Sequence, residues 1–131
     1  MDDNLEPLGV DLILELHALQ IELFGGLQGV RDLPGLESAL AQPTAEFFGV
    51  QRYPDTFAQA GAYLYYIARA HPFADGNKRT ALHTALTWLE LHSETCPLDD
   101  QTLEDLVVEA IEAHWSPEQI AQALRGSPTR P

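Results

Sequence analysis

One segment of ten residues, from His71 to Thr80, gathers the side chains that phosphate chemistry needs. It reads His-Pro-Phe-Ala-Asp-Gly-Asn-Lys-Arg-Thr and holds an imidazole, a carboxylate, an amide and two cations. An imidazole with an ordinary pKa of about 6.5 can take a proton from a hydroxyl at neutral pH, so His71 is a candidate catalytic base. Asp75 is a candidate Mg²⁺ ligand, because Mg²⁺ usually binds through one or two carboxylates plus substrate phosphates.

The rest of this segment suits contacts to phosphate. A helix is expected to begin near Asn77, and the first N–H groups of a helix lack partners within it. Together with the helix dipole, these amides form a site for phosphate, and Gly76 lets a phosphate approach the backbone closely. Lys78 and Arg79 supply positive charge. The segment therefore predicts transfer of a phosphoryl or nucleotidyl group from a bound nucleotide onto a hydroxyl.

Each of these residues also has an ordinary structural interpretation. His71 could end a helix, and Asp75 and Asn77 could be turn and N-cap residues. Lys78 and Arg79 could belong to a solvated helix face. Their combination in this order favours the catalytic interpretation over these separate ones.

Strong helical periodicity flanks the segment on both sides. Apolar and small residues recur at helical spacing from Asp55 up to His71, where the following proline disfavours helix, and this predicts a central helix. A second helix is expected from about Asn77 to His92. Further helices are expected before Gly25 (Leu12, Leu16, Leu19 and Leu23 on one face), from Pro34 to about Ala41, from Thr102 to Ala113, and from Pro117 to Leu124 with Ser116 as N-cap.

The predicted fold class is therefore all-α: a compact, single-domain bundle of about six helices. Residues 25–32 contain three glycines and no helical period, which predicts a loop or a short hairpin. We expect residues 1–125 to form one catalytic domain and residues 126–131, rich in proline, to form a frayed C-terminal tail.

Composition excludes several classes of protein. The formal net charge is −13, with seven Lys and Arg against 20 Asp and Glu, which argues against a nucleic-acid partner. No apolar run approaches the roughly 20 residues that cross a bilayer, and the N-terminus lacks the basic region of a secretion signal. A single cysteine, Cys96, suits a reducing compartment. These features predict a cytoplasmic protein with no membrane partner.

The segment from His71 to Thr80 resembles the signature of the Fic/Doc superfamily, H-x-F-x-[D/E]-G-N-x-R. It is most similar to the Doc (death-on-curing) branch, H-x-F-x-D-[A/G]-N-K-R-T, and matches that form throughout. Residues 25–32 are similar to the flap of this family, and residues 36–40 are also typical of it. The ten-residue motif is highly specific, whereas the similarity of the flap is supportive only.

The resemblance implies a role for each motif residue. His71 would be the catalytic base, Asp75 the Mg²⁺ ligand, and the nucleotide would be ATP. Four motif residues would contact the phosphates of ATP, together with an arginine that lies two residues before the motif. These are Gly76, Asn77, Lys78 and Arg79 of the motif, and Arg69. His83 stands where Doc-like sequences can carry asparagine, so we assign it to the nucleotide site as a further candidate.

Lys78 separates the possible activities. Ordinary Fic adenylyltransferases have glycine at this position and a second arginine where this chain has Leu82. The branch that carries lysine is thought to bind ATP reversed, which implies a protein kinase whose acceptor is a Ser/Thr hydroxyl of an elongation factor Tu-like protein, so that translation stops. Two alternatives remain open: an adenylyltransferase that tolerates Lys78, and a non-catalytic domain that keeps the loop as a scaffold.

The sequence also indicates how the activity would be regulated. Many Fic proteins inhibit themselves with an [S/T]-x-x-x-E-[G/N] helix, and no glutamate here has Ser or Thr four residues before it. The resemblance therefore implies a toxin that is inhibited in trans by an antitoxin protein. Phe47, Phe48 and Tyr53 could line the antitoxin groove, although core packing is the favoured interpretation. His17, His92 and His114 are expected to be ordinary surface or core residues.

Overall fold

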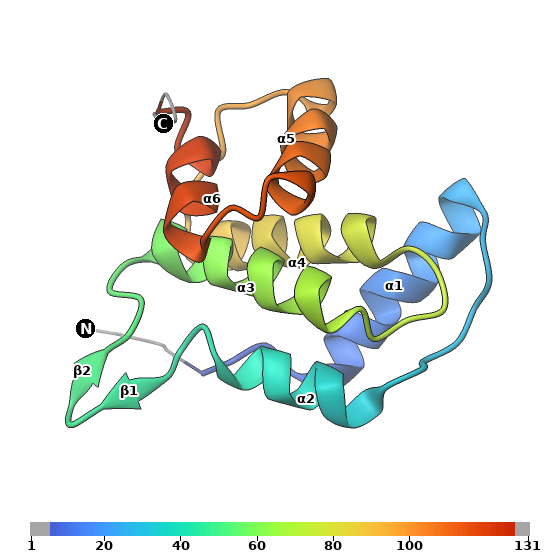
Figure 1. The fold of residues 1–131 in the computed structure, drawn as a ribbon, viewed down its shortest axis with the longest axis horizontal. Coiled ribbons are helices and arrows are strands. Elements are labelled where there is room, and N and C mark those ends of the chain that lie inside the picture. The colour runs from blue at the N-terminus through green and yellow to red at the C-terminus, as the bar shows by residue number, and fades with distance from the viewer. Residues whose placement is uncertain (1–5, 128–131) are drawn as a thin grey trace.

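The computed structural model describes residues 6–127 and has six α-helices and one two-stranded antiparallel sheet within them (Figure 1). None of the helices in this range is both long and apolar enough to cross a bilayer. The all-α prediction is confirmed. The elements in order are α1 (Val10–Phe24), α2 (Leu33–Ala41), β1 (Glu46–Phe47), β2 (Val50–Gln51), α3 (Thr56–Ala70), α4 (Asn77–Leu91), α5 (Asp100–Glu112) and α6 (Pro117–Leu124).

Helix α3 lies at the centre of the bundle, as its apolar stripe predicts. It begins where the Asp55 carboxylate accepts the Ala58 N–H at 2.8 Å, and it packs against α2, α4 and α6. A Cβ built on Gly61 would lie 2.6 Å from the Pro117 carbonyl oxygen, so the missing side chain lets α3 and α6 approach closely. This packing holds the C-terminal end of α3, which carries His71, in a fixed place.

Helix α1 buries only part of the face that carries its leucines, since Leu12 and Leu16 pack half-buried against the core. Leu19 and Leu23 are 45% and 63% exposed, whereas the buried face consists of Ile13, His17, Gln20 and Ile21. The leucine pattern predicts the inward face only in part, because two polar residues, His17 and Gln20, are buried there. His17 is accommodated there by stacking on the Phe73 ring with a centroid distance of 3.8 Å.

Residues 25–32, which we call the flap, form a loop rather than a hairpin. The flap runs along the end of the bundle where the chain turns from α3 into α4 (Figure 1), and Val30 forms a β-bridge with Phe73. The hairpin of the structure is β1–β2, at the opposite end. The prediction of core packing is wrong for Phe47 and Phe48, which lie on this hairpin and are 59% and 105% exposed. It is confirmed for Tyr53, which is buried.

The boundaries of the remaining helices agree closely with those predicted from the sequence. Ser116 caps α6 in a capping box with Gln119, and α5 begins at Asp100, two residues before the expected start. Trp88 is buried in the core, and Trp115 packs partly buried against it. The tail prediction concerns mainly residues 128–131, which lie outside the described residues.

Candidate active site

His71 ends α3 in a left-handed conformation, with φ 51° and ψ 53°, and Pro72 follows it. The left-handed residue turns the chain sharply out of the helix, so the imidazole is exposed at the mouth of the α3–α4 loop. Its Nδ1 atom lies 2.8 Å from Nη2 of Arg31 in the flap. Sequence reasoning did not identify Arg31 as a site residue, because the contact joins segments 40 residues apart.

Asp75 is also held by the flap. Its Oδ2 atom accepts the Leu27 N–H at 2.8 Å, and a Cβ built on Gly26 would lie 3.2 Å from the Asp75 Cβ. The backbone oxygen of Asp75 lies 2.7 Å from Nε2 of His17, which donates to it because a carbonyl only accepts. His17 is therefore a buried support of the loop, and its stacking partner Phe73 belongs to the same segment.

The Asn77 side chain is used within the loop itself. Its Oδ1 atom accepts the Phe73 N–H at 2.9 Å, and its Nδ2 atom donates to the Phe73 carbonyl oxygen at 3.0 Å. The side chain is only 5% exposed. The predicted phosphate contact from Asn77 can therefore come from its backbone N–H, while its amide group shapes the loop.

Replacing Asn77 with alanine is expected to destabilise the free protein by about 1–3 kcal/mol, because it leaves the buried Phe73 N–H without a partner. Chemical denaturation without nucleotide measures this change. Asn77→Asp offers a matched comparison, since one carboxylate oxygen can still accept from Phe73. If Asn77→Ala were as stable as the wild type, the amide would not have this structural role.

The start of α4 presents backbone donors and cations together. Thr80 makes the first intrahelical bond, to Gly76 O at 3.0 Å, so the N–H groups of residues 77–79 precede it. Gly76 has φ 77° and ψ 20°, a conformation that glycine adopts readily, and as N-cap it has no side chain to cover these donors. Lys78 and Arg79 are exposed beside them. The arrangement is suited to phosphate oxygens.

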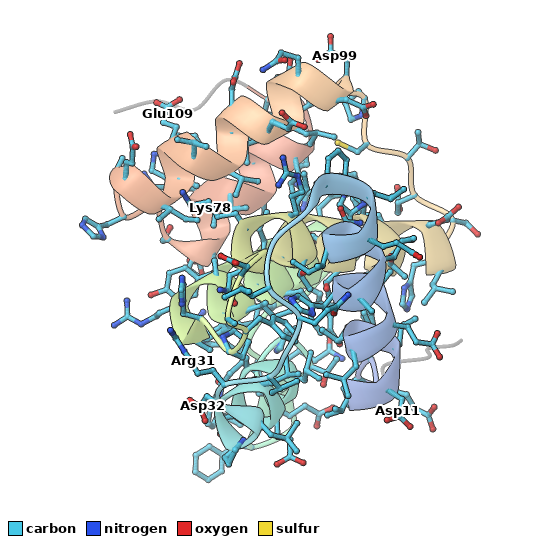
Figure 2. The ribbon with its side chains drawn as sticks, turned by 90° about the vertical axis from the view of Figure 1, so that its right-hand side faces the viewer. Asp11, Arg31, Asp32, Lys78, Asp99 and Glu109 are labelled. Atoms are coloured by element: carbon cyan, nitrogen blue, oxygen red, sulfur yellow. The ribbon has the colours of Figure 1, made fainter. Side chains whose placement is uncertain are left out.

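These groups line a cleft of about 340 Å³, within the general range of roughly 300–1,000 Å³ for ligand sites. The lining comes from His71, residues 74–79 and Leu82 along the α3–α4 loop and α4, and from three residues of α5, Glu104, Val107 and Val108. Figure 2 shows Lys78 beneath α5, with Arg31 on the flap side. The α5 wall was not predicted, because periodicity marks Val107 only as a core residue.

Arg69 and His83 are not among the residues that line this cleft. Arg69 is exposed on the last turn of α3, 3.4 Å from the Tyr65 hydroxyl. His83 lies half-buried on α4, where burial lowers the pKa of its imidazole, Arg79 acts in the same direction and Asp100 opposes both. Their assignment to the nucleotide site stays a prediction, whereas the other predicted residues are brought together.

The cleft offers one protein ligand for magnesium, the carboxylate of Asp75. Asp75 is exposed, and its hydrogen bond to the Leu27 N–H uses Oδ2. The other carboxylate oxygen, Oδ1, can therefore bind the ion. Within residues 6–127 no three His, Cys, Asp or Glu side chains gather as a metal site. An ion at Asp75 would therefore be completed by phosphate oxygens and water, which is how Mg²⁺ commonly binds with nucleotides.

Comparison with known proteins agrees with this site. The profile of the Fic/DOC family matches residues 7–89, which span α1 through most of α4. The chain is 38% identical over 105 residues to the protein called Toxin Doc of Mycolicibacterium smegmatis, covering 79% of this chain and 81% of that one. It is 34% identical over 113 residues to the protein called Protein kinase doc of Escherichia phage P1, covering 86% and 88%. This chain therefore belongs to the Fic/DOC family.

Proposed function

We propose that this protein is the toxin of a toxin–antitoxin pair and a Mg²⁺- and ATP-dependent protein kinase. It would transfer the γ-phosphate of ATP onto a Ser/Thr hydroxyl of an elongation factor Tu-like protein in the cytoplasm. The observation that carries the proposal is the cleft in which His71, Asp75 and Lys78 meet the free amides of α4. The relatives named as a toxin and as a protein kinase support it.

The lining of the cleft offers two kinds of contact, which suit the phosphates and the nucleoside of a nucleotide. Backbone N–H groups of α4, with Lys78 and Arg79, would bind the phosphates. The apolar wall of Leu82, Val107 and Val108 would pack against the nucleoside. Glu104 would repel phosphate, and this also favours an orientation in which the nucleoside, and not the phosphates, lies against α5.

The reaction then needs few further groups. Magnesium at Asp75 would supply neutralisation of charge on the phosphate oxygens. The lone pair of His71 Nε2 would take the proton of the acceptor hydroxyl as its oxygen attacks the γ-phosphorus, and the bond from that phosphorus to the bridging oxygen breaks, releasing ADP. Positioning and electrostatics account for most of the catalysis in this kind of transfer.

Labelled ATP tests the reaction. Incubation of the protein with Mg²⁺, an elongation factor Tu-like acceptor and ATP labelled at the γ- or the α-phosphate is expected to label the acceptor only from the γ position. Transfer of the α-label would instead identify an adenylyltransferase, and transfer of neither label would identify a scaffold. Co-expression of an antitoxin encoded beside the gene should relieve growth arrest.

Replacing Lys78 with glycine is expected to weaken γ-phosphate transfer by about 10- to 100-fold, the loss expected for one charge-assisted contact. The smaller residue is also expected to admit the opposite nucleotide orientation, measured as α-label on the acceptor. Lys78→Met keeps the bulk without the charge, so it should lose γ-transfer without gaining α-transfer. Unchanged γ-transfer in Lys78→Gly would refute this role of Lys78.

A further inference from the structure

The flap places a guanidinium group directly on the proposed catalytic base. The backbone N–H of Arg31 donates to the Pro72 carbonyl oxygen at 2.7 Å, which anchors the flap beside the end of α3. From there, Nη2 of Arg31 reaches both Nδ1 of His71, at 2.8 Å, and the His71 carbonyl oxygen, at 3.2 Å. These contacts belong to no step of the reaction described above.

The contact fixes which nitrogen of His71 carries the proton. A guanidinium group only donates hydrogen bonds and stays protonated, so Nδ1 must be the acceptor. A neutral imidazole has one N–H group, which is then on Nε2. With Nδ1 engaged by Arg31 and Nε2 already protonated, the ring has no free lone pair for the acceptor hydroxyl. In this arrangement His71 cannot act as a base.

A bound nucleotide would compete for the same guanidinium group. Phosphate oxygens carry negative charge whereas the imidazole is neutral, so the cationic guanidinium group is attracted to phosphate more strongly than to Nδ1 of His71. Arginine also binds phosphate through two parallel N–H groups. His71 lines the cleft that would hold the phosphates, so Arg31 needs to move only from the imidazole to the neighbouring ligand.

We propose that Arg31 gates the base: it holds His71 as the inactive Nε2–H tautomer until nucleotide phosphate draws the guanidinium away. This inference rests on the proposed function of the cleft. After the exchange, Nε2 releases its proton to water and Nδ1 takes one up from water, so the neutral ring keeps a single proton. The lone pair on Nε2 then faces the acceptor hydroxyl.

Histidine NMR on the full chain tests the gate. Two-bond ¹H–¹⁵N correlation of ¹⁵N-histidine-labelled protein reports the tautomer of each ring, and the His71 signal is assigned by its loss in His71→Asn. Without nucleotide, the wild type is expected to show only the Nε2–H form, whereas Arg31→Gln should show both tautomers. Adding Mg²⁺ and a non-hydrolysable ATP analogue to the wild type should raise the Nδ1–H form to at least the Arg31→Gln level.

Kinetics provide a second readout. Arg31→Gln should raise the KM for ATP about tenfold, since a phosphate contact is lost, while kcat is maintained because the base is no longer held. Arg31→Lys keeps the charge and should restore part of the affinity. The control is Arg52→Gln, which removes an exposed arginine that pairs with Glu118 near the hairpin and should change neither the tautomer nor the KM.

Two outcomes would overturn the gate: equal tautomer populations in the wild type and Arg31→Gln without nucleotide, or no change of tautomer when the analogue saturates the wild type. Failure of the proposed function looks different. In that case calorimetry would detect no binding of the analogue, while the difference between the wild type and Arg31→Gln without nucleotide would still decide whether Arg31 fixes the tautomer.

Discussion

His71→Asn is expected to lower phosphoryl transfer by about 10²- to 10⁴-fold, the usual contribution of a general base. Asparagine is the appropriate replacement because His71 has φ 51°, a left-handed conformation that asparagine tolerates better than alanine does. The Asn side chain cannot take up the proton of the acceptor hydroxyl. The measurement is the rate of γ-label transfer at saturating ATP, together with growth arrest on expression.

The control for this variant is His114→Asn. His114 is exposed, also has a positive φ of 55°, and is not among the residues lining the cleft, so its replacement should leave transfer unchanged. Thermal unfolding of both variants shows whether the fold is kept. Transfer at the wild-type rate by a folded His71→Asn protein would remove His71 from the role of base.

Asp75→Asn is expected to lower transfer on the order of 10²- to 10³-fold, because Lewis-acid stabilisation by a metal contributes several kcal/mol. The fold should persist, since the amide oxygen can still accept from Leu27 and the bond from His17 uses the backbone. The measurement is the dependence of the rate on Mg²⁺ concentration, which should shift to higher concentrations.

Asp32→Asn makes the same change of charge at the last residue of the flap. Asp32 caps α2 by accepting the Gly35 N–H, a role that asparagine performs equally well, so this variant should keep both the rate and the Mg²⁺ dependence. If Asp75→Asn kept the wild-type Mg²⁺ dependence, Asp75 would not be the metal ligand.

The sequence predicted the helices well because their signals are local. Asp55 and Ser116 cap their helices, and proline or glycine marks the ends of α3 and α6. Errors arose where burial depends on distant partners. The inward face of α1 is set by His17, which contacts Phe73 and Asp75 across 56 and 58 positions, and no periodicity reports such a contact.

In the candidate site, too, local signals were predicted correctly and contacts between distant segments were not. The motif identified His71 and Asp75 because their residue types and order are informative by themselves. It did not reveal Arg31 or the α5 wall, which reach the site only through the tertiary fold. It named Asn77 as a phosphate contact but did not reveal that both polar atoms of its side chain bind the Phe73 backbone.

The proposed function requires that the first amides of α4 bind the phosphates of ATP. A titration of the antitoxin-free, ¹⁵N-labelled protein with Mg²⁺ and a non-hydrolysable ATP analogue, followed by backbone amide NMR, tests it most directly. We expect the largest shifts at residues 76–79, with one common Kd. If the amide signals of residues 76–79 did not shift at saturating analogue, or if shifts were confined to the separate cavity beside Tyr65 and Trp115, these amides would not be the phosphate site.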